Sequence, residues 1–288
     1  MKKLALFFAI GTFILAGCRE KPEQIEEHRV IVFFSTMPVS SSLLKSTGNE
    51  AENLITKAIL FGIDAHNNVI ETYSAINNPP PDGTEIEISR EVTALYAIAN
   101  PSTDMETVNP ATVSDLMNMT GNFTNAPQSP FLMGGMGNII GYSVNIEVIR
   151  AVAKIEIIGK NDFHIESVTV SNTPDKGYVF KRETFSVPAS SGKTAYPAIN
   201  SSTPIFYLAE SSGSEPVQFV VTGKYLGRQA NYTLVLKSEE QNIDILRNRH
   251  YQVGISPNTE SDCTITISIP DWDYEDLGVY EIPDEDFE

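Results

Sequence analysis

The residues with the clearest chemistry lie near the N-terminus, where a short apolar run ends in Leu15-Ala16-Gly17-Cys18. Two lysines after Met1, an apolar stretch and a small residue before a cysteine are typical of a bacterial secretory signal that ends in a lipid-attachment site. We expect cleavage before Cys18, a diacylglycerol on its thiol and a further acyl chain on the new amino group. The apolar run is shorter than the roughly 20 residues that span a bilayer, so it does not predict a membrane helix.

Other chemistry is sparse in the chain. The histidines, His28, His66, His164 and His250, show no metal-ligand spacing, and we expect them in turns or on the surface. Cys263 has no partner once Cys18 is acylated, and its place in an alternating strand pattern predicts an inert, buried thiol. The glycines at 134, 135, 137 and 141 do not form a phosphate-binding loop, and no nucleophile elbow occurs. The sequence therefore predicts no catalytic residues, no metal and no cofactor.

Composition limits the partners. The formal net charge is -17 and the chain has no basic stripe, so nucleic acid is excluded as a partner. Acidic residues gather in the last 18 positions, where Asp271-Trp272-Asp273 begins a segment that resembles a calcium loop only superficially. It lacks the glycine and the glutamate that such a loop needs. We interpret the acidic end as a solubility feature.

The first half of the mature chain predicts mainly β-strands. Residues 18–28 form a polar tether, and the apolar run that follows predicts a strand buried on both faces, formed by Val30, Ile31, Val32, Phe33 and Phe34. Residues 55–63 and 69–73 predict a hairpin, and residues 86–99 a strand. Asn109 and Pro110 indicate the start of a short helix over 110–119, and residues 120–141 are expected to be loop.

A change in the alternation of apolar residues near Arg150 indicates a domain boundary. Apolar side chains occupy even positions before it and odd positions after it, and a shift of one residue moves side chains to the other face of a strand. We therefore expect an N-terminal domain over 29–149 and a C-terminal domain over 150–288. Alternating segments separated by turns in the second half predict an all-β sandwich.

Six segments together resemble a known family. They are the lipid-attachment site, Ala58-Ile59-Leu60-Phe61-Gly62-Ile63-Asp64, Leu95-Tyr96-Ala97-Ile98-Ala99-Asn100-Pro101, Leu132-Met133-Gly134-Gly135, Arg150-Ala151-Val152-Ala153-Lys154-Ile155-Glu156-Ile157, and Arg247-Asn248-Arg249-His250-Tyr251-Gln252-Val253 with the later Asp271-Trp272. In this order they resemble the fimbrillin family, the FimA-type subunits of Bacteroidales type V pili.

The resemblance implies two transthyretin-like β-sandwich domains of Greek-key type and a lipoprotein precursor that is delivered to the outer membrane. It also implies assembly by donor-strand exchange, in which a surface protease removes the first strand and a partner subunit's strand fills the groove. The partners would be other fimbrial subunits, the lipoprotein-processing enzymes and that protease. Our candidates for the donor strand are Ile265, Ile267, Ile269, Val279 and Ile282. Burial of four or five apolar side chains of the first strand would contribute roughly 6 to 15 kcal/mol.

The sequence departs from the family at the processing site. Family stalk subunits usually carry arginine in the loop after the first strand, but no arginine lies between Arg29 and Arg90. Lys45 is the basic residue of that loop, so we expect cleavage between Lys45 and Ser46, or no cleavage. A cut chain would be a stalk or accessory subunit for adhesion, and an uncut chain an anchor that keeps its lipid.

Two other functions stay open. One is a monomeric surface lipoprotein that binds glycans with its β-sandwich, although Trp272 is the single tryptophan. The other is a β-rich hydrolase, for which the sequence offers no nucleophile and base.

Overall fold

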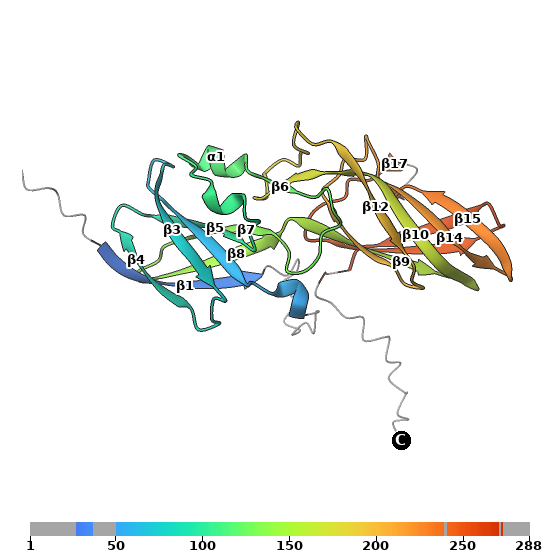
Figure 1. Cartoon of the computed structure of the whole chain (residues 1–288), viewed down its shortest axis with the longest axis horizontal. Coiled ribbons are helices and arrows are strands. Elements are labelled where there is room, and N and C mark those ends of the chain that lie inside the picture. The colour runs from blue at the N-terminus through green and yellow to red at the C-terminus, as the bar shows by residue number, and fades with distance from the viewer. Residues whose placement is uncertain (1–26, 37–49, 239–240, 271, 273–288) are drawn as a thin grey trace, which may run out of the picture.

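The computed structural model describes residues 27–36, 50–238, 241–270 and 272. The described chain is almost entirely β-structure, and Figure 1 shows two β-units that follow one another along the long axis of the molecule. An all-β fold with several sheets was the expectation from the sequence, and it is confirmed.

A seven-stranded sheet forms the N-terminal unit, in the order β3-β2-β5-β7-β8-β1-β4. Its strands are β1 (Glu27–Thr36), β2 (Lys57–Ile63), β3 (Val69–Asn77), β4 (Thr84–Ser89), β5 (Ala94–Ala99), β7 (Met133–Asn138) and β8 (Ser143–Arg150). The short elements between them are η1 (Glu50–Asn53), η2 (Met105–Thr107), α1 (Val113–Met117) and β6 (Thr120–Asn122).

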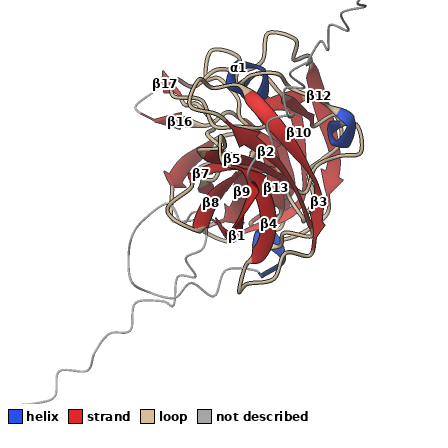
Figure 2. Cartoon of the chain, turned by 90° about the vertical axis from the view of Figure 1, so that its left-hand side faces the viewer, coloured by secondary structure: helices blue, strands red, loops and turns tan. Residues whose placement is uncertain are grey.

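This sheet curls around a core that all seven strands share. The two edge strands, β3 and β4, approach each other. The Glu71 carboxylate of β3 accepts a hydrogen bond from the Ser89 backbone of β4 at 3.2 Å. Figure 2, seen from the end of the N-terminal unit, shows the strands wrapped around its centre. A second cluster, with Phe61, Ile98 and Leu116 fully buried, lies where α1 packs against β2 and β5. Strands β2 and β5 are therefore buried on both faces.

Two four-stranded sheets pack face to face in the C-terminal unit. One has the order β13-β9-β18-β19 and the other β12-β10-β14-β15. The eight strands of these sheets are β9 (Val152–Gly159), β10 (Phe163–Pro174), β12 (Lys193–Ile199), β13 (Ile205–Ala209), β14 (Gln218–Tyr225), β15 (Arg228–Leu234), β18 (His250–Pro257) and β19 (Cys263–Ser268). The short strands β16 (Lys237–Ser238) and β17 (Gln241–Asn242) pair with each other, and β11 (Lys176–Tyr178) lies outside both sheets. A single apolar cluster from both sheets fills the space between them, as the alternating segments predicted.

The change of alternation at Arg150 coincides with the passage between units. Strand β8 ends the run in the seven-stranded sheet at Arg150, and β9 begins in the next sheet at Val152. A two-stranded sheet, β6 paired with β11, joins the halves. These observations support our proposal that the domain boundary lies at residue 150.

Two strand predictions in the N-terminal half need correction. Residues 120–141 are not simply loop, because they contain β6 and the central strand β7. Residues 86–99 are not one strand but parts of β4 and β5, which lie at different places in the sheet. A turn separates them, in which the Val92 backbone donates to the Ser89 carbonyl at 3.1 Å.

The helix prediction was also displaced. The helix covers only Val113–Met117, and its N-cap is Thr112 rather than Asn109. Thr112 accepts from the Asp115 backbone, and the Asp115 carboxylate accepts from the Thr112 backbone, which completes a capping box. This reciprocal pair explains why the helix starts later than the Asn-Pro signal indicated.

Strand β1 is buried on one face only, contrary to the prediction of burial on both. Val30 and Val32 are fully buried, whereas Ile31 is 40% exposed and Phe33 and Phe34 are half-buried. The apolar cluster around α1 covers the outer face of the sheet at β2 and β5, but it does not extend to β1. The apolar run therefore predicted the strand correctly, but it did not predict that only one face of the strand is buried.

The glycines of β7 allow a close approach to β8, and we predict that Gly135→Ala destabilises the protein. A Cβ atom at Gly135 would lie 1.9 Å from the Glu147 carbonyl oxygen, which is backbone and cannot rotate away. We expect a loss of about 2 kcal/mol or more in the free energy of unfolding, measured by urea denaturation of the non-lipidated chain. Met136→Ala, one residue along the same strand at a 40% exposed side chain, should change it by under about 0.5 kcal/mol. Equal effects of the two variants would contradict this prediction.

Candidate functional site

Strand β1 is an inner strand that is paired on both sides. It runs antiparallel to β4, from Glu27 opposite Ser89 to Val32 opposite Thr84. It runs parallel to β8, starting with Ile31 opposite Ser143. Without β1, the edges of β4 and β8 would both carry open backbone groups, which is the condition under which an added strand binds.

The side chains that hold β1 in the core are few. Val30 and Val32 are completely buried, and at about 1.5 to 3 kcal/mol each they contribute roughly 3 to 6 kcal/mol. This is less than the sequence suggested, because Ile31 points outward and Phe33 and Phe34 are only half-buried. Arg29 forms exposed ion pairs with two glutamates of β4, and such pairs add little. Backbone pairing therefore carries much of the attachment.

Several residues singled out by the sequence lie outside the described residues. They are Cys18, Lys45, Ser46, Val279 and Ile282. Their roles in lipid attachment, processing and strand donation stay predictions.

The rest of the candidate donor segment is already part of the C-terminal unit. Strand β19 lies at a sheet edge, with Ile265 opposite Ile255 and Ile267 opposite Val253. Ile265 and Ile267 pack against the C-terminal core, whereas Ile269 is 48% exposed. Of these three candidates, Ile265 and Ile267 therefore belong to a folded sheet, and Ile269 lies just after its last strand.

A buried carboxylate links the segment after β1 to the C-terminal unit. Glu52 of η1 is 2% exposed. Its carboxylate accepts hydrogen bonds from Lys154 Nζ at 3.0 Å, from the Tyr207 hydroxyl at 2.5 Å and from Trp272 Nε1 at 2.6 Å. We call Glu52, Lys154, Tyr207 and Trp272 the junction cluster. It ties together a short helix, two strands and the start of the C-terminal segment.

Arg150 secures the same junction from the other side. It is 1% exposed, and its Nε donates to the Glu52 carbonyl at 3.1 Å. Its Nη1 donates to Asn248 Oδ1 at 2.7 Å, and Nη2 donates to Asn53. The guanidinium also lies 4.7 Å from the centre of the Trp272 ring, a cation–π contact.

Aromatic rings complete the packing around Trp272. The indole is 3% exposed and stacks on Tyr207 with ring centres 6.0 Å apart. The ring of Phe131 meets the Trp272 ring edge-on, with ring centres 6.2 Å apart. Its centre lies 4.5 Å from that of the Tyr207 ring, to which it is tilted. Trp272 is therefore held firmly against both units.

The junction cluster is held in its ionised form by hydrogen bonding. Burial alone would raise the pKa of Glu52, but the bonds from Tyr207, Lys154 and Trp272 together hold the pKa below its ordinary value. Burial, reinforced by the bond to Glu52, raises the pKa of Tyr207 well above its usual range. Because every partner donates to the carboxylate, this arrangement is structural rather than poised for proton transfer.

One histidine prediction is wrong. His250 is not in a turn or on the surface but is 6% exposed in β18, where its Nε2 lies 3.1 Å from the Glu156 carboxylate. Burial lowers the pKa of His250. It pairs with Lys154 in the strand register, so it sits beside the junction cluster as a neutral packing residue.

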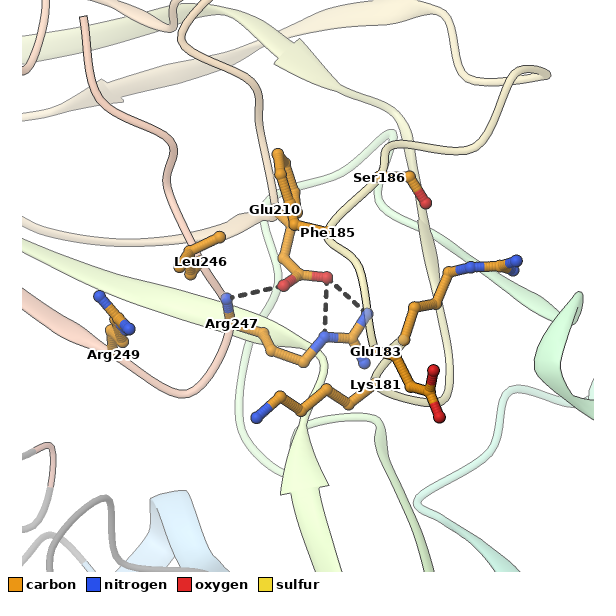
Figure 3. Close-up of a pocket in the computed structure, with 9 residues that line it drawn as sticks. Lys181, Glu183, Phe185, Ser186, Glu210, Leu246, Arg247 and Arg249 are labelled. Atoms are coloured by element: carbon orange, nitrogen blue, oxygen red, sulfur yellow. Dashed lines mark hydrogen bonds and ion pairs between the residues drawn. The ribbon is translucent and has the colours of Figure 1, made fainter.

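The segment that resembled a family motif near the end of the chain contributes buried structural residues. Arg247 is 5% exposed, and its Nε donates to Glu210 at 2.7 Å. Its Nη1 and Nη2 donate to the carbonyls of Val179 and Tyr178 at 2.9 and 2.7 Å. Figure 3 shows this pair at the side of a cavity of about 190 Å³, which Lys181 and Arg249 also line. The motif therefore holds the β11 region against the start of β18.

The junction cluster was not foreseen from the sequence. Its members are up to 220 residues apart in the chain, and a glutamate in a polar segment carries no local signal of burial. Lys154 stands at a polar position of the alternating strand 151–157, which favours exposure rather than burial. Trp272 entered the sequence analysis through the family resemblance and as the single tryptophan, and neither observation indicates its partners.

Other kinds of site find no support in the part of the chain that the structure describes. Within these residues, no group of three or more histidine, cysteine or acidic side chains is placed to hold a metal ion. The same residues include no helix that is long and apolar enough to cross a membrane. Cys263 is half-exposed, and burial raises the pKa of its thiol, which disfavours reactivity.

Comparison with known proteins identifies the family. Residues 64–277 match the sequence profile of the fimbrillin-A-associated anchor proteins Mfa1 and Mfa2. No curated protein sequence matched the chain.

Solved structures share the fold at low identity. A candidate cell adhesion protein from Bacteroides eggerthii is 14% identical with a TM-score of 0.59, over 86% of this chain and 96% of that one. The tip fimbrial protein Mfa3 from Porphyromonas gingivalis, with a C-terminal truncation, is 14% identical with a TM-score of 0.57, over 86% and 100%. A fimbrial assembly protein from Parabacteroides distasonis is 12% identical with a TM-score of 0.54, over 85% and 99%.

We predict that Glu52→Gln destabilises the protein in a pH-dependent way. Removing the charge leaves Lys154 without its ion-pair partner in the junction cluster, which should cost about 3 kcal/mol at pH 7. Because the folded-state pKa of Glu52 is lowered, its charge stabilises the protein above its ordinary pKa of 4.5, and this contribution is lost as the pH falls through the folded-state value. Denaturation curves of the non-lipidated chain should show the full difference in stability between the two proteins at pH 7, and this difference should shrink as the pH is lowered below 4.5.

Glu87→Gln is the matched control for this variant. Glu87 pairs with Arg29 at 3.2 Å but is 58% exposed, so its loss should cost under about 1 kcal/mol. A Glu52→Gln variant as stable as Glu87→Gln at pH 7 would refute a structural role for the junction cluster.

Proposed function

We propose, because the chain belongs to the family of fimbrillin-A-associated anchor proteins, that it is a fimbrial subunit fixed to the outer membrane by a lipid on Cys18. The observation that carries the proposal is the place of β1. This strand follows the tether directly and is paired along both edges within the seven-stranded sheet. A pull on the lipid would load the backbone bonds of β1 along its length, so the strand is suited to hold a fimbria on the cell.

The family description and the lack of an arginine after β1 favour the anchor role over that of a stalk subunit. The family is described as anchor proteins, and no arginine lies between Arg29 and Arg90 for a processing protease to recognise. We infer that the chain stays uncut and keeps its acylated N-terminus. Its role is structural rather than enzymatic.

A processed stalk or accessory subunit is the second candidate. Cleavage between Lys45 and Ser46 would release the lipid, the tether and β1 together. The specific observation in favour is that Val30 and Val32 are the only fully buried side chains among the described residues of β1. A partner subunit's strand with two apolar side chains at this spacing could therefore replace it by donor-strand exchange.

A monomeric glycan-binding role is disfavoured by the position of Trp272. The indole is 3% exposed and is committed to Glu52 and Arg150. Sugar platforms need exposed aromatic faces, so the single tryptophan of the chain is not available for one.

We predict that Cys18→Ser releases the protein from the outer membrane. The wild-type chain should sediment with membranes and give an acylated N-terminal peptide that begins at Cys18, measured by mass spectrometry. Cys263→Ser, which alters the other cysteine, should leave both results unchanged. A wild-type N-terminus at Ser46 would overturn the anchor proposal and establish the processed subunit instead.

We further predict that β1 can be replaced by a separate strand. A chain that begins at Ser46 should be less stable than the full chain and should be restored by refolding with a peptide of residues 27–36. Val30→Asp with Val32→Asp in the peptide should weaken binding by at least about a hundredfold, because two buried side chains are lost.

Ile31→Asp is the control peptide for this experiment. Ile31 is 40% exposed on the outer face of the strand, so this peptide should bind nearly as well as the unmodified one, measured by calorimetry. Equal loss in both peptides would show that the core beneath β1 does not select the side chains of the strand.

A further inference from the structure

The turn of residues 139–142, which we call the tip turn, exposes two large apolar side chains. Ile140 and Tyr142 are each 77% exposed, the highest values among the large hydrophobic residues that the structure describes. The Ile140 backbone donates to the Ser143 carbonyl at 2.9 Å, and the Ser143 backbone donates back at 3.2 Å. Gly141 has a φ of +63°, which suits glycine. The turn is therefore hydrogen-bonded while both side chains point into solvent.

The tip turn lies at the end of the molecule where β1 begins. The Ile31 backbone donates to the Tyr142 carbonyl at 2.9 Å. Because β1 pairs in parallel with β8 from Ile31 onward, its earlier residues extend past the start of β8. Figure 1 shows this end of β1 on the side of the N-terminal unit that faces away from the C-terminal unit.

The length of the chain before β1 limits how far the bilayer can be from this end. Eight residues, Arg19 to Glu26, lie between Cys18 and Glu27. At no more than 3.6 Å per residue they span at most about 30 Å, and a flexible chain of this length spans about 15 Å on average. A lipid on Cys18 therefore brings the start of β1 near the membrane surface, and the tip turn lies beside Ile31, four residues further along the strand.

The chemistry of the two side chains matches that surface. Tyrosine is enriched at membrane–water interfaces, where its ring lies among the headgroups and its hydroxyl remains hydrated. An isoleucine side chain gains free energy on leaving water for the acyl boundary. The partly exposed Ile31 lies beside them and extends the apolar surface.

We propose that the tip turn is a second membrane contact, which inserts Ile140 and Tyr142 into the headgroup layer of the leaflet that holds the Cys18 lipid. This inference rests on the proposed lipid anchor. A second contact would fix the orientation of the subunit, because attachment at one point alone leaves the molecule free to tilt. The occupant is the lipid surface, and attachment of another protein to this turn is the competing outcome.

The first test measures depth in the lipidated protein. Tyr142→Trp places an indole in the tip turn, and the buried Trp272 supplies a constant background. In phosphatidylcholine vesicles with brominated acyl chains, the Tyr142→Trp protein should lose a clearly larger share of its emission than the wild type. Leu226→Trp is the control, since Leu226 is 70% exposed in the turn between β14 and β15 at the far end of the C-terminal unit. Its added indole should not be quenched.

The second test separates this inference from the lipid anchor itself. The non-lipidated Cys18→Ser chain should bind phosphatidylcholine vesicles weakly, and Ile140→Ser with Tyr142→Ser should reduce this binding by about tenfold or more. Leu226→Ser should leave it unchanged. If the lipidated protein is vesicle-bound but Tyr142→Trp is not quenched, the membrane contact is refuted while the anchor stands.

Two further outcomes are decisive. If Cys18 carries no lipid but the tip-turn variants still lose vesicle binding, the anchor fails and the membrane contact stands. If the serine variants abolish fimbrial assembly and leave quenching and vesicle binding unchanged, the tip turn contacts a protein and the inference is overturned.

Discussion

The pairing of β1 between β4 and β8 is the constraint on which the N-terminal unit depends. Six residue pairs join it to each neighbour, and only Ile31 and Val32 are shared by both sets. The strand therefore bridges β4 to the rest of the sheet, and β4 is attached to the remaining strands through it. With two buried side chains, the roughly 3 to 6 kcal/mol from apolar burial is comparable to the whole stability of a small domain. A strand of this kind is essential to the fold and yet exchangeable in principle.

The junction cluster gives this arrangement a second fixed point. Glu52 comes shortly after the segment that follows β1, and it is bonded to Lys154, Tyr207 and Trp272 of the C-terminal half. If β1 were removed, the chain from Glu52 onward would still be attached to the C-terminal unit through these bonds. The buried ion pair need not add net stability, since desolvation opposes it. Its effect is on specificity: the buried Glu52 carboxylate is satisfied when Lys154, Tyr207 and Trp272 all donate to it, and this requirement favours one arrangement of the two units.

The sequence predicted the fold class well and the site only in part. Alternation of apolar residues located β8 and β9 and the passage between them at Arg150, because burial on one face leaves a period of two. It missed β7, whose sequence Met-Gly-Gly-Met-Gly-Asn has the composition of a loop. Glycine is required there by the close approach of the β8 backbone, which is a tertiary cause. The junction cluster was missed for the same reason, since Glu52 lies in a polar segment and the apolar run around Tyr207 predicts a strand but not the partner of its hydroxyl.

The positions of the two ends of the molecule give the proposed anchor a direction. Strand β1 begins at one end, four residues before its contact with the tip turn, while Trp272 lies at the junction between the units. With the tip turn on the bilayer, the junction and the C-terminal unit project away from the membrane, toward the next subunit. A load along the fimbria would then pass from the C-terminal unit through the junction cluster into the seven-stranded sheet and along β1 to the lipid. From the C-terminal unit to β1, each step of that path is a set of backbone pairs or buried hydrogen bonds, so the same contacts that define the fold would also carry the load.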